Sequence, residues 1–200
     1  MSDAHGRPPM AVRAWLRLSG VLVYLELRLA ALLLAALFCI ILTNAGTRYA
    51  GMPLYWIDEL AIFTMAWLAF VGTSAMSRLR LDFAVNFLAG ALPPRLALLV
   101  RCGSILLVIL FGIAIAWMAM LWLDPVGMAS AGFDGRALAQ QTFNFVYTER
   151  TMTLAWPRWA VMSIVPLFSV TLVIHGIANL IDEIYGLKRA LPAGFEAGVA

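Results

Sequence analysis

The sequence predicts an all-α integral membrane protein: four transmembrane helices, an amphipathic N-terminal segment and a short interfacial helix between the second and third spans. Of its 200 residues, 63% are hydrophobic and 12% are charged, and the mean hydropathy is +0.90. Soluble domains carry about 25% charged residues. The chain also contains four long apolar runs, and a bilayer core requires about 20 such residues per helix. Helices are expected because hydrocarbon offers no partner to unpaired backbone groups, and the alternation of a β-barrel is lacking.

The apolar runs predict one membrane domain, residues 27–185, with spans at about 27–47, 57–77, 98–123 and 159–182. Residues 1–26 are predicted to form a cytoplasmic tail and an amphipathic segment, and residues 186–200 a second cytoplasmic tail. Arg13 and Arg17 alternate with apolar residues before the first span. This pattern suits an amphipathic helix at the inner leaflet, or a first span that starts early with its arginines reaching the headgroups. Both interpretations stay open.

The distribution of basic residues predicts the orientation. Ten of the 14 Lys and Arg residues lie before the first span, around the second connection or after the last span, namely Arg7, Arg13, Arg17, Arg28, Arg78, Arg80, Arg95, Arg101, Lys188 and Arg189. The opposite side holds only Arg48, Arg136, Arg150 and Arg158. Because Lys and Arg are enriched in cytoplasmic loops, both termini are expected in the cytoplasm. The basic residues are not clustered, so we expect no nucleic-acid partner.

Three connecting segments have recognisable patterns. Residues 83–91 have apolar residues at helical spacing and predict a short helix in the inner interface, before Pro93 and Pro94 open the third span. The outer connection, 124–158, is long enough to suggest a function, and 136–147 could form a surface helix within it. Pro166 is expected to kink the last span, with Ser163 and Ser169 taking up freed backbone groups.

Catalytic and cofactor motifs are missing from the sequence. The two histidines, His5 and His175, cannot form a pair of axial haem ligands within the bilayer, since His5 lies in the tail. No Cys and His cluster has metal-ligand spacing, and no phosphate loop or Ser, His and acid set is present. We therefore expect no enzyme, no cofactor and no metal site. His175 is expected to be hydrogen-bonded across helices rather than to carry protons.

The connection between the first two spans, residues 44–60, carries the candidate site; we call it the hinge. Its candidate partner-interface residues are Asn44, Arg48, Tyr49, Trp56, Asp58 and Glu59. Arg48 suits the carboxyl end of one helix dipole, and Asp58 and Glu59 suit the amino end of the next. An ion pair from Arg48 to Asp58 or Glu59 across the hinge is a further possibility. The aromatic residues are expected at headgroup level.

These residues resemble the small membrane subunit of tripartite ATP-independent periplasmic (TRAP) transporters, the DctQ-like family. The resemblance rests on Asn44-x-x-x-Arg48-Tyr49 and Trp56-x-Asp58-Glu59-Leu60. It continues through Gly72, Arg78 and residues 82–86 to Leu92-Pro93-Pro94-Arg95, and returns at 154–166. It covers most of the membrane-embedded chain.

The resemblance implies a non-enzymatic, multi-pass component of a cation-driven, commonly sodium-driven, importer in the cytoplasmic (inner) membrane of a bacterium. In that family a large permease subunit holds the substrate and ion sites, a periplasmic binding protein delivers an organic acid, and the small subunit braces the permease. The expected partners are those two proteins and the lipid bilayer. The alternatives are an independent small carrier that uses His175, and a membrane anchor of a respiratory or signalling complex.

Overall fold

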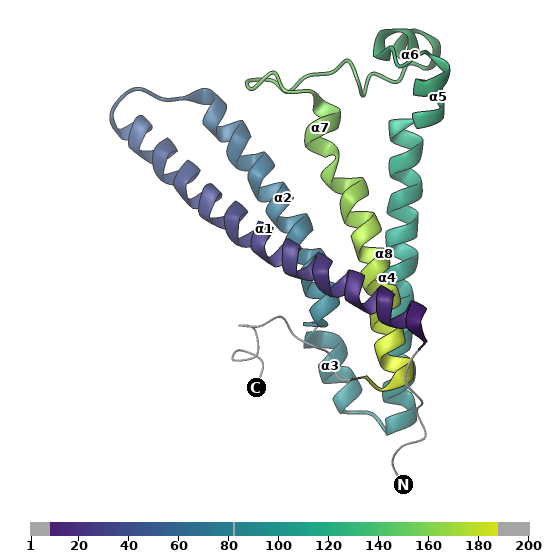
Figure 1. Cartoon of the computed structure of the whole chain (residues 1–200). Coiled ribbons are helices and arrows are strands. Elements are labelled where there is room, and N and C mark those ends of the chain that lie inside the picture. Colours follow the sequence, from purple (N-terminus) through teal and green to yellow (C-terminus); the bar gives the residue numbers. More distant parts are fainter. Residues whose placement is uncertain (1–8, 82, 188–200) are drawn as a thin grey trace. The chain divides into compact units, whose positions relative to one another are not determined.

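The computed structural model describes residues 9–81 and 83–187. The described residues form the helices α1 (Met10–Tyr49), α2 (Tyr55–Leu79), α3 (Phe83–Gly90), α4 (Pro94–Leu123), α5 (Pro125–Ser130), α6 (Gly135–Thr142), α7 (Arg158–Met162) and α8 (Ile164–Tyr185) (Figure 1). The four predicted spans are confirmed, because α1, α2, α4 with α5, and α7 with α8 are each long and apolar enough to cross a membrane. Arg7, Asp82, Lys188 and Arg189 lie outside the described residues, as do the parts of the predicted tails at 1–8 and 188–200.

The amphipathic segment and the first span form a single helix. α1 runs without interruption for 40 residues, so residues 10–26 and the first span belong to one helix, and both interpretations of residues 10–26 stay predictions. α3 ends one residue before the predicted helix end. α4 begins at Pro94. A backbone N–H at the first position of a helix has no partner within that helix, so a proline there costs no hydrogen bond. The division of the chain into tails and a membrane domain stays a prediction.

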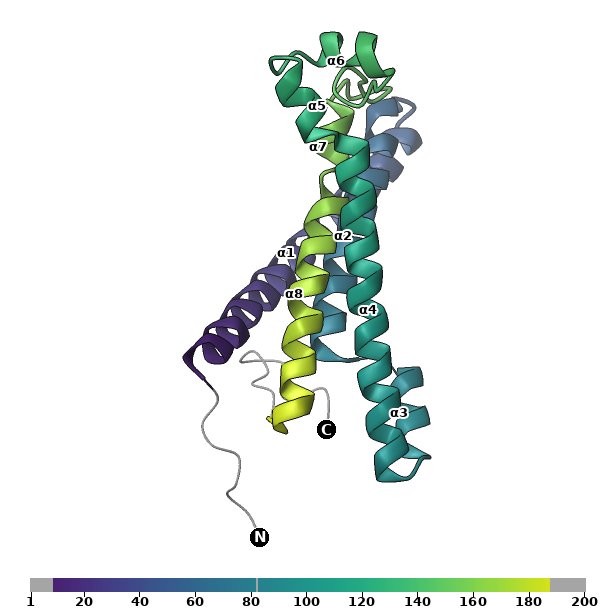
Figure 2. The same ribbon diagram turned by 90° about the vertical axis from the view of Figure 1, so that its right-hand side faces the viewer.

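The contacts divide the chain into two units, and each long helix contributes residues to both. The first unit consists of residues 1–28, 72–113 and 170–200, and the second of residues 29–71 and 114–169. In the first unit, the buried side chains of Val23, Ala75 and Leu79 form a small apolar core between α1 and α2. α3 lies alongside the first turns of α4 in the same unit (Figure 2).

A glycine permits the close approach of α8 to α4 in the first unit. A Cβ at Gly176 would lie 2.5 Å from Cγ1 of Ile109, a separation that side chains do not tolerate. Gly72, which belongs to a row of small residues on α2, has nothing within 4 Å of such a Cβ. The close approach of α8 to α4 therefore requires a glycine at position 176, whereas a Cβ at Gly72 of α2 would clash with nothing.

The last span is broken near Pro166, as predicted, but the break lies before the proline. The helix stops at Met162 and resumes at Ile164, because the proline ring clashes with the carbonyl four residues earlier and offers that carbonyl no N–H. The Val161 carbonyl at the break accepts a hydrogen bond of 2.8 Å from the Trp67 indole N–H. Ser163 donates to the Ala160 carbonyl at 2.7 Å, and Ser169 to that of Pro166 at 2.7 Å. α2 therefore supplies a donor at the break.

The outer connection is ordered by α5, α6 and a few side chains. Leu138 and Val146 are buried there. The Tyr147 hydroxyl donates to the Leu123 carbonyl, and the Asn144 amide to that of Trp122, both at 2.8 Å. These bonds satisfy carbonyls at the end of α4, which have no partner within the helix. The predicted surface helix is shorter than expected, because the left-handed conformation of Phe143 (φ 58°) ends α6 at Thr142.

Candidate functional site

The hinge begins where α1 ends, and glycine sets the direction of the chain there. Gly51 has φ 74°, a left-handed conformation that glycine adopts without steric cost. Its N–H donates to the Arg48 carbonyl at 3.1 Å, and the Met52 N–H to that of Thr47 at 2.9 Å. These bonds close the helix end, and α2 begins after a short link at Tyr55.

Three of the predicted hinge residues form one polar cluster. The Asn44 side chain accepts from Arg48 Nε at 3.0 Å and donates to Asp58 Oδ1 at 2.6 Å. The Arg48 guanidinium forms an ion pair of 2.5 Å with Asp58 Oδ2. Of the two ion pairs considered, the structure contains the one with Asp58. The Arg48 and Asp58 side chains are 56% and 45% exposed, so solvent screens the pair and its net stabilisation is about 0–1 kcal/mol.

Glu59 has a different role from its neighbour. Its Oε1 accepts from the Met152 N–H at 2.9 Å, while Oε2 accepts from the N–H groups of Thr153 and Leu154, both at 2.8 Å, and from the Thr153 hydroxyl at 2.6 Å. Successive backbone N–H groups that converge on one carboxylate form an anion-binding nest. Glu59 therefore fastens the segment before α7 to the start of α2.

Replacing Glu59 with Ala is expected to release residues 152–154. Hydrogen exchange should be faster at the amides of Met152, Thr153 and Leu154 by about tenfold or more, because three N–H groups lose their acceptor at once. Hydrogen-exchange mass spectrometry of peptides that span 150–157 measures this. Asp58→Ala is the matched control, and it should leave those amides unchanged. Equal protection in both variants would contradict the role of Glu59.

The remaining hinge candidates are exposed aromatic residues. Tyr49 is 97% exposed and Trp56 is 43% exposed. Of the six predicted residues, three thus form a polar cluster, Glu59 binds the backbone of residues 152–154, and two are exposed aromatic residues.

The outer connection contains a tyrosine with a shifted pKa. Burial raises the pKa of the Tyr147 hydroxyl above its usual value, and the carboxylate of Asp124 adds to the effect.

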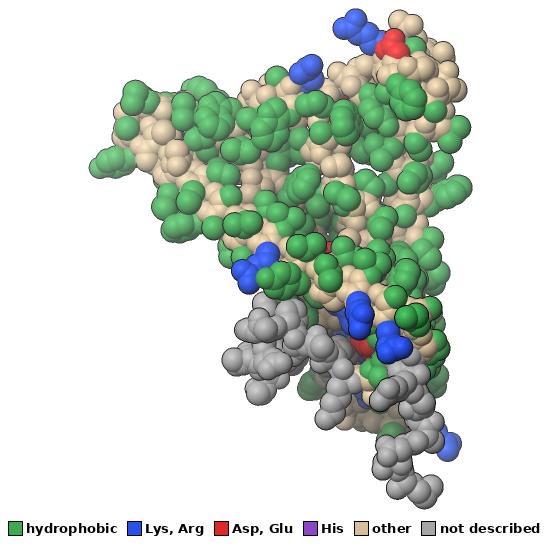
Figure 3. Space-filling view, viewed as in Figure 1, with side chains coloured by type: hydrophobic (Ala, Val, Ile, Leu, Met, Phe, Trp, Pro, Cys, Tyr) green, Lys and Arg blue, Asp and Glu red, His purple; other side chains and the backbone are tan. Residues whose placement is uncertain are grey.

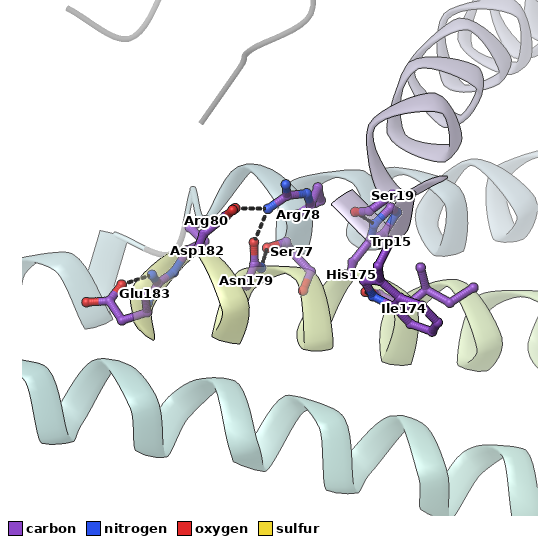
Figure 4. A network of polar contacts seen from close by, with 10 residues as sticks. All are labelled: Trp15, Ser19, Ser77, Arg78, Arg80, Ile174, His175, Asn179, Asp182 and Glu183. Carbon is purple, nitrogen blue, oxygen red and sulfur yellow. Dashed lines mark hydrogen bonds and ion pairs between the residues drawn. The ribbon is translucent and has the colours of Figure 1, made fainter. Parts of the chain in front are cut away.

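The first unit contains a buried polar network that was not among the predictions from the sequence (Figure 4). Arg78 of α2 forms bonds to two residues of α8, at 2.6 Å to Asp182 and at 2.7 Å to Asn179. The Asn179 amide also donates to the Ser77 carbonyl at 2.8 Å. The Arg78 and Asp182 side chains are only 12% and 6% exposed. This ion pair therefore holds α2 against α8 with little competition from water.

A second ion pair extends the network. Arg80 bonds to Glu183 Oε2 at 2.5 Å, and Arg101 of α4 lies 3.6 Å from Oε1 of the same carboxylate. The Glu183 side chain is 13% exposed. α4, α8 and the turn that follows α2 thus share one carboxylate in the first unit.

His175 connects α8 to α1. Its Nδ1 lies 2.8 Å from the Ser19 hydroxyl and its Nε2 lies 3.0 Å from Glu26. The other oxygen of Glu26 accepts from Ser74 of α2 at 2.7 Å. The His175 side chain is fully buried, and the expected hydrogen bonding of this residue across helices is confirmed. Nearby, Trp15 donates to the Ile174 carbonyl at 3.2 Å.

Helical spacing was the available signal for this network. His175, Asn179 and Asp182 are separated by four and three residues, so they share one face of α8. Ser74 and Arg78 are four apart on α2. Charged residues considered one at a time do not reveal these shared faces.

The described residues offer nothing that would hold a metal ion. Among residues 9–81 and 83–187, no three or more His, Cys, Asp or Glu side chains are grouped in a way that could bind one. The polar side chains of the network bond to one another. Their arrangement stabilises helix contacts.

The comparison with family models identifies the family. Residues 37–186 match the model described as "Tripartite ATP-independent periplasmic transporters, DctQ component". The chain belongs to the DctQ family. No curated protein and no solved structure matches the chain at a significant level. This DctQ protein is therefore the small membrane subunit of a TRAP transporter, a family of transporter components and not of enzymes. It is a multi-pass protein of the inner membrane.

The matched region of this DctQ protein includes the whole hinge and the network residues of α2, α4 and α8. It begins at residue 37, so Trp15, Ser19 and Glu26 of α1 lie outside it. The contacts of His175 therefore reach from the matched region to the part of α1 that precedes it.

Proposed function

We propose that this DctQ protein braces the large permease subunit of a TRAP transporter. The permease takes up an organic acid, delivered by a periplasmic binding protein, at the expense of a cation gradient, commonly of sodium. Support comes from the family and from where polar groups lie in the first unit. Arg78 bonds to Asp182, and Arg80 bonds to Glu183. Charges that neutralise one another within one chain suit a rigid support better than an ion carrier.

The apolar surface of α1 is the proposed contact with the permease. Hydrophobic side chains predominate on the face seen in Figure 3. Only 6% of the most apolar window of α1 is buried within the chain, compared with 39% for α7 and α8. Leu32 and Phe38 are 68% and 63% exposed. Large exposed apolar surfaces mark contacts with membrane or with protein, and α1 leaves the most surface available for such contacts.

The hinge is the proposed contact outside the membrane. With both termini in the cytoplasm, as the basic residues predict, the hinge and the connection 124–158 face the periplasm. Tyr49 and Trp56 are exposed there. The bonds of Arg48 to Asp58, and of Glu59 to residues 152–154, hold the neighbouring backbone segments in place. The periplasmic binding protein and the outer loops of the permease are the proposed partners of this surface.

Co-purification with cross-linking tests the bracing role. Cys39 of α1 is exposed and carries a free thiol, so a short thiol-reactive cross-linker should join it to the large subunit in the assembled transporter. Cys39→Ser is the control that should abolish the product. A small subunit that purifies without the permease and catalyses uptake when reconstituted alone would overturn the proposal.

Replacing Arg48 with Ala is expected to weaken assembly or uptake. The loss should be about two- to fivefold, because an exposed ion pair contributes at most about 1 kcal/mol. Substitutions in residues 1–9 serve as controls, and they should have smaller effects. Subunit recovery on an affinity column and substrate uptake by proteoliposomes measure the two quantities. Equal and negligible losses would leave Arg48 with a purely local role at the helix end.

A further inference from the structure

The second unit contains an apolar groove with one charged residue in its lining. The groove has a volume of about 490 Å³ and lies between α2, α4 and the broken helix α7–α8, with Phe70, Ile115, Met118, Met162 and Val165 along its walls. Ala119 also lines it, and is only 5% exposed. This volume is within the range of about 300–1,000 Å³ for ligand sites. The groove is large enough for a flexible apolar chain.

An ion pair lies at one end of the groove. Arg158, the first residue of α7, belongs to the lining. Its guanidinium bonds to Glu149 Oε2 at 2.5 Å, and the two side chains are 52% and 45% exposed. A guanidinium has five N–H donors and a carboxylate has two oxygens. Arg158 therefore retains N–H donors for an anionic group of a ligand, and Glu149 retains an oxygen that can accept from a cationic group.

Two tryptophans place this ion pair at the membrane surface. Trp122 lines the groove at the end of α4, and Trp159 follows Arg158 on α7; they are 38% and 41% exposed. Tryptophan side chains collect at the level of the lipid headgroups. The charged end of the groove therefore lies at headgroup level, and its apolar walls lie deeper along the spans.

We propose that this groove binds a zwitterionic phospholipid with a primary ammonium headgroup. One acyl chain lies between α2, α4 and α8, the phosphate binds Arg158, and the ammonium donates to Glu149. The argument is charge complementarity. Adjacent phosphate and ammonium groups match an adjacent guanidinium and carboxylate. The phosphate of an anionic lipid without an ammonium would instead lie close to the Glu149 carboxylate, with no cationic group of the lipid to offset the repulsion between the two negative charges.

A second groove of the same unit provides the matched control. It has a volume of about 450 Å³ and is lined by residues that include Leu33, Phe63 and Ala160. Its lining contains no charged residue among those described. The polar hydrogens of Thr64 and Trp67 in its lining donate to the carbonyls of Leu60 and Val161. This groove can receive hydrocarbon but cannot select a headgroup.

Native mass spectrometry of the full chain tests the proposal. The purified, delipidated protein is mixed with detergent micelles that contain equal amounts of phosphatidylethanolamine and phosphatidylglycerol, and the lipid that survives detergent removal is counted. We expect one phosphatidylethanolamine per chain, retained about tenfold over phosphatidylglycerol. Arg158→Gln and Ala119→Phe should each reduce this retention about tenfold. Glu149→Gln should remove the preference between the lipids, and Ala160→Phe should change neither quantity.

The variants separate binding from folding. Arg158 and Glu149 are half exposed, so their substitutions should leave the melting temperature nearly unchanged even if Ala119→Phe disturbs packing. Equal retention of the two lipids by the unsubstituted chain, or unchanged retention in Arg158→Gln, would overturn the proposal. A cross-link from Ile115→Cys to the large subunit, in a transporter that retains no lipid, would show that protein occupies the groove instead.

Discussion

Replacing Arg78 with Ala will lower the free energy of unfolding by about 3–5 kcal/mol, which is the effect of removing one partner of a buried ion pair. The Asp182 side chain is 6% exposed, so its charge would remain away from water without a counterion. Asn179 would lose its hydrogen bond from Arg78 as well. Thermal or denaturant unfolding of the purified chain in detergent measures the change.

The exposed ion pair of the hinge is the control for this experiment. Arg48→Ala removes the same side chain from a pair with the same chemistry, but its partner Asp58 is 45% exposed and water can solvate it. The expected loss is about 0–1 kcal/mol. The double variant Arg78→Ala with Asp182→Ala should lose less than the sum of the two single variants. Similar losses for Arg78→Ala and Arg48→Ala would show that burial of the Arg78 pair has no energetic consequence.

Replacing His175 with Ala will detach α1 from α8 in the first unit. The substitution leaves Ser19 and Glu26 buried without their shared partner and creates a cavity, and unsatisfied buried groups cost about 1–3 kcal/mol each. We expect a total loss of about 3–5 kcal/mol. Faster hydrogen exchange of residues 15–26, compared with residues 40–49 of the same helix, would locate the change.

A second substitution separates this structural role from proton transfer. His175→Gln retains a donor and an acceptor but cannot titrate. If His175 only joins helices, His175→Gln should recover most of the stability, and the assembled transporter should keep its uptake from about pH 5 to 8, the range in which histidine usually titrates. Uptake that is lost in His175→Gln while stability is retained would instead support a proton-carrying histidine.

Local patterns predict much of the architecture. The spans follow from hydropathy, because bilayer thickness sets the length of each apolar run independently of its neighbours. The start of α4 follows from the rigid ring of Pro94. The Arg48 and Asp58 pair was among the possibilities because the two residues flank one short turn. The hinge cluster is therefore accessible to sequence reasoning, since its members lie within 14 positions of one another.

Long-range pairings were not accessible in this way. Glu59 and Leu154 are separated by 95 positions, and Arg78 and Asp182 by 104. The spacing of His175, Asn179 and Asp182 places them on one face of α8, but it does not identify the helix that this face contacts. The hydrogen-bond donor at the break before Pro166 also comes from a distant part of the sequence, since Trp67 of α2 donates to the Val161 carbonyl there.

The membrane character, the number of spans and the family follow from residues close together in the chain, because solvation by lipid and turn chemistry act locally. Which charges are buried, and which remain on the surface, depends on how helices distant in sequence pack. Asp58 precedes an apolar run of the chain and Asp182 follows one. Yet the Asp58 side chain is 45% exposed, whereas the Asp182 side chain, which is paired with Arg78 of α2, is only 6% exposed. Helical spacing in the sequence predicts which residues share one face of a helix. The packing of the helices determines which residues of other helices that face contacts.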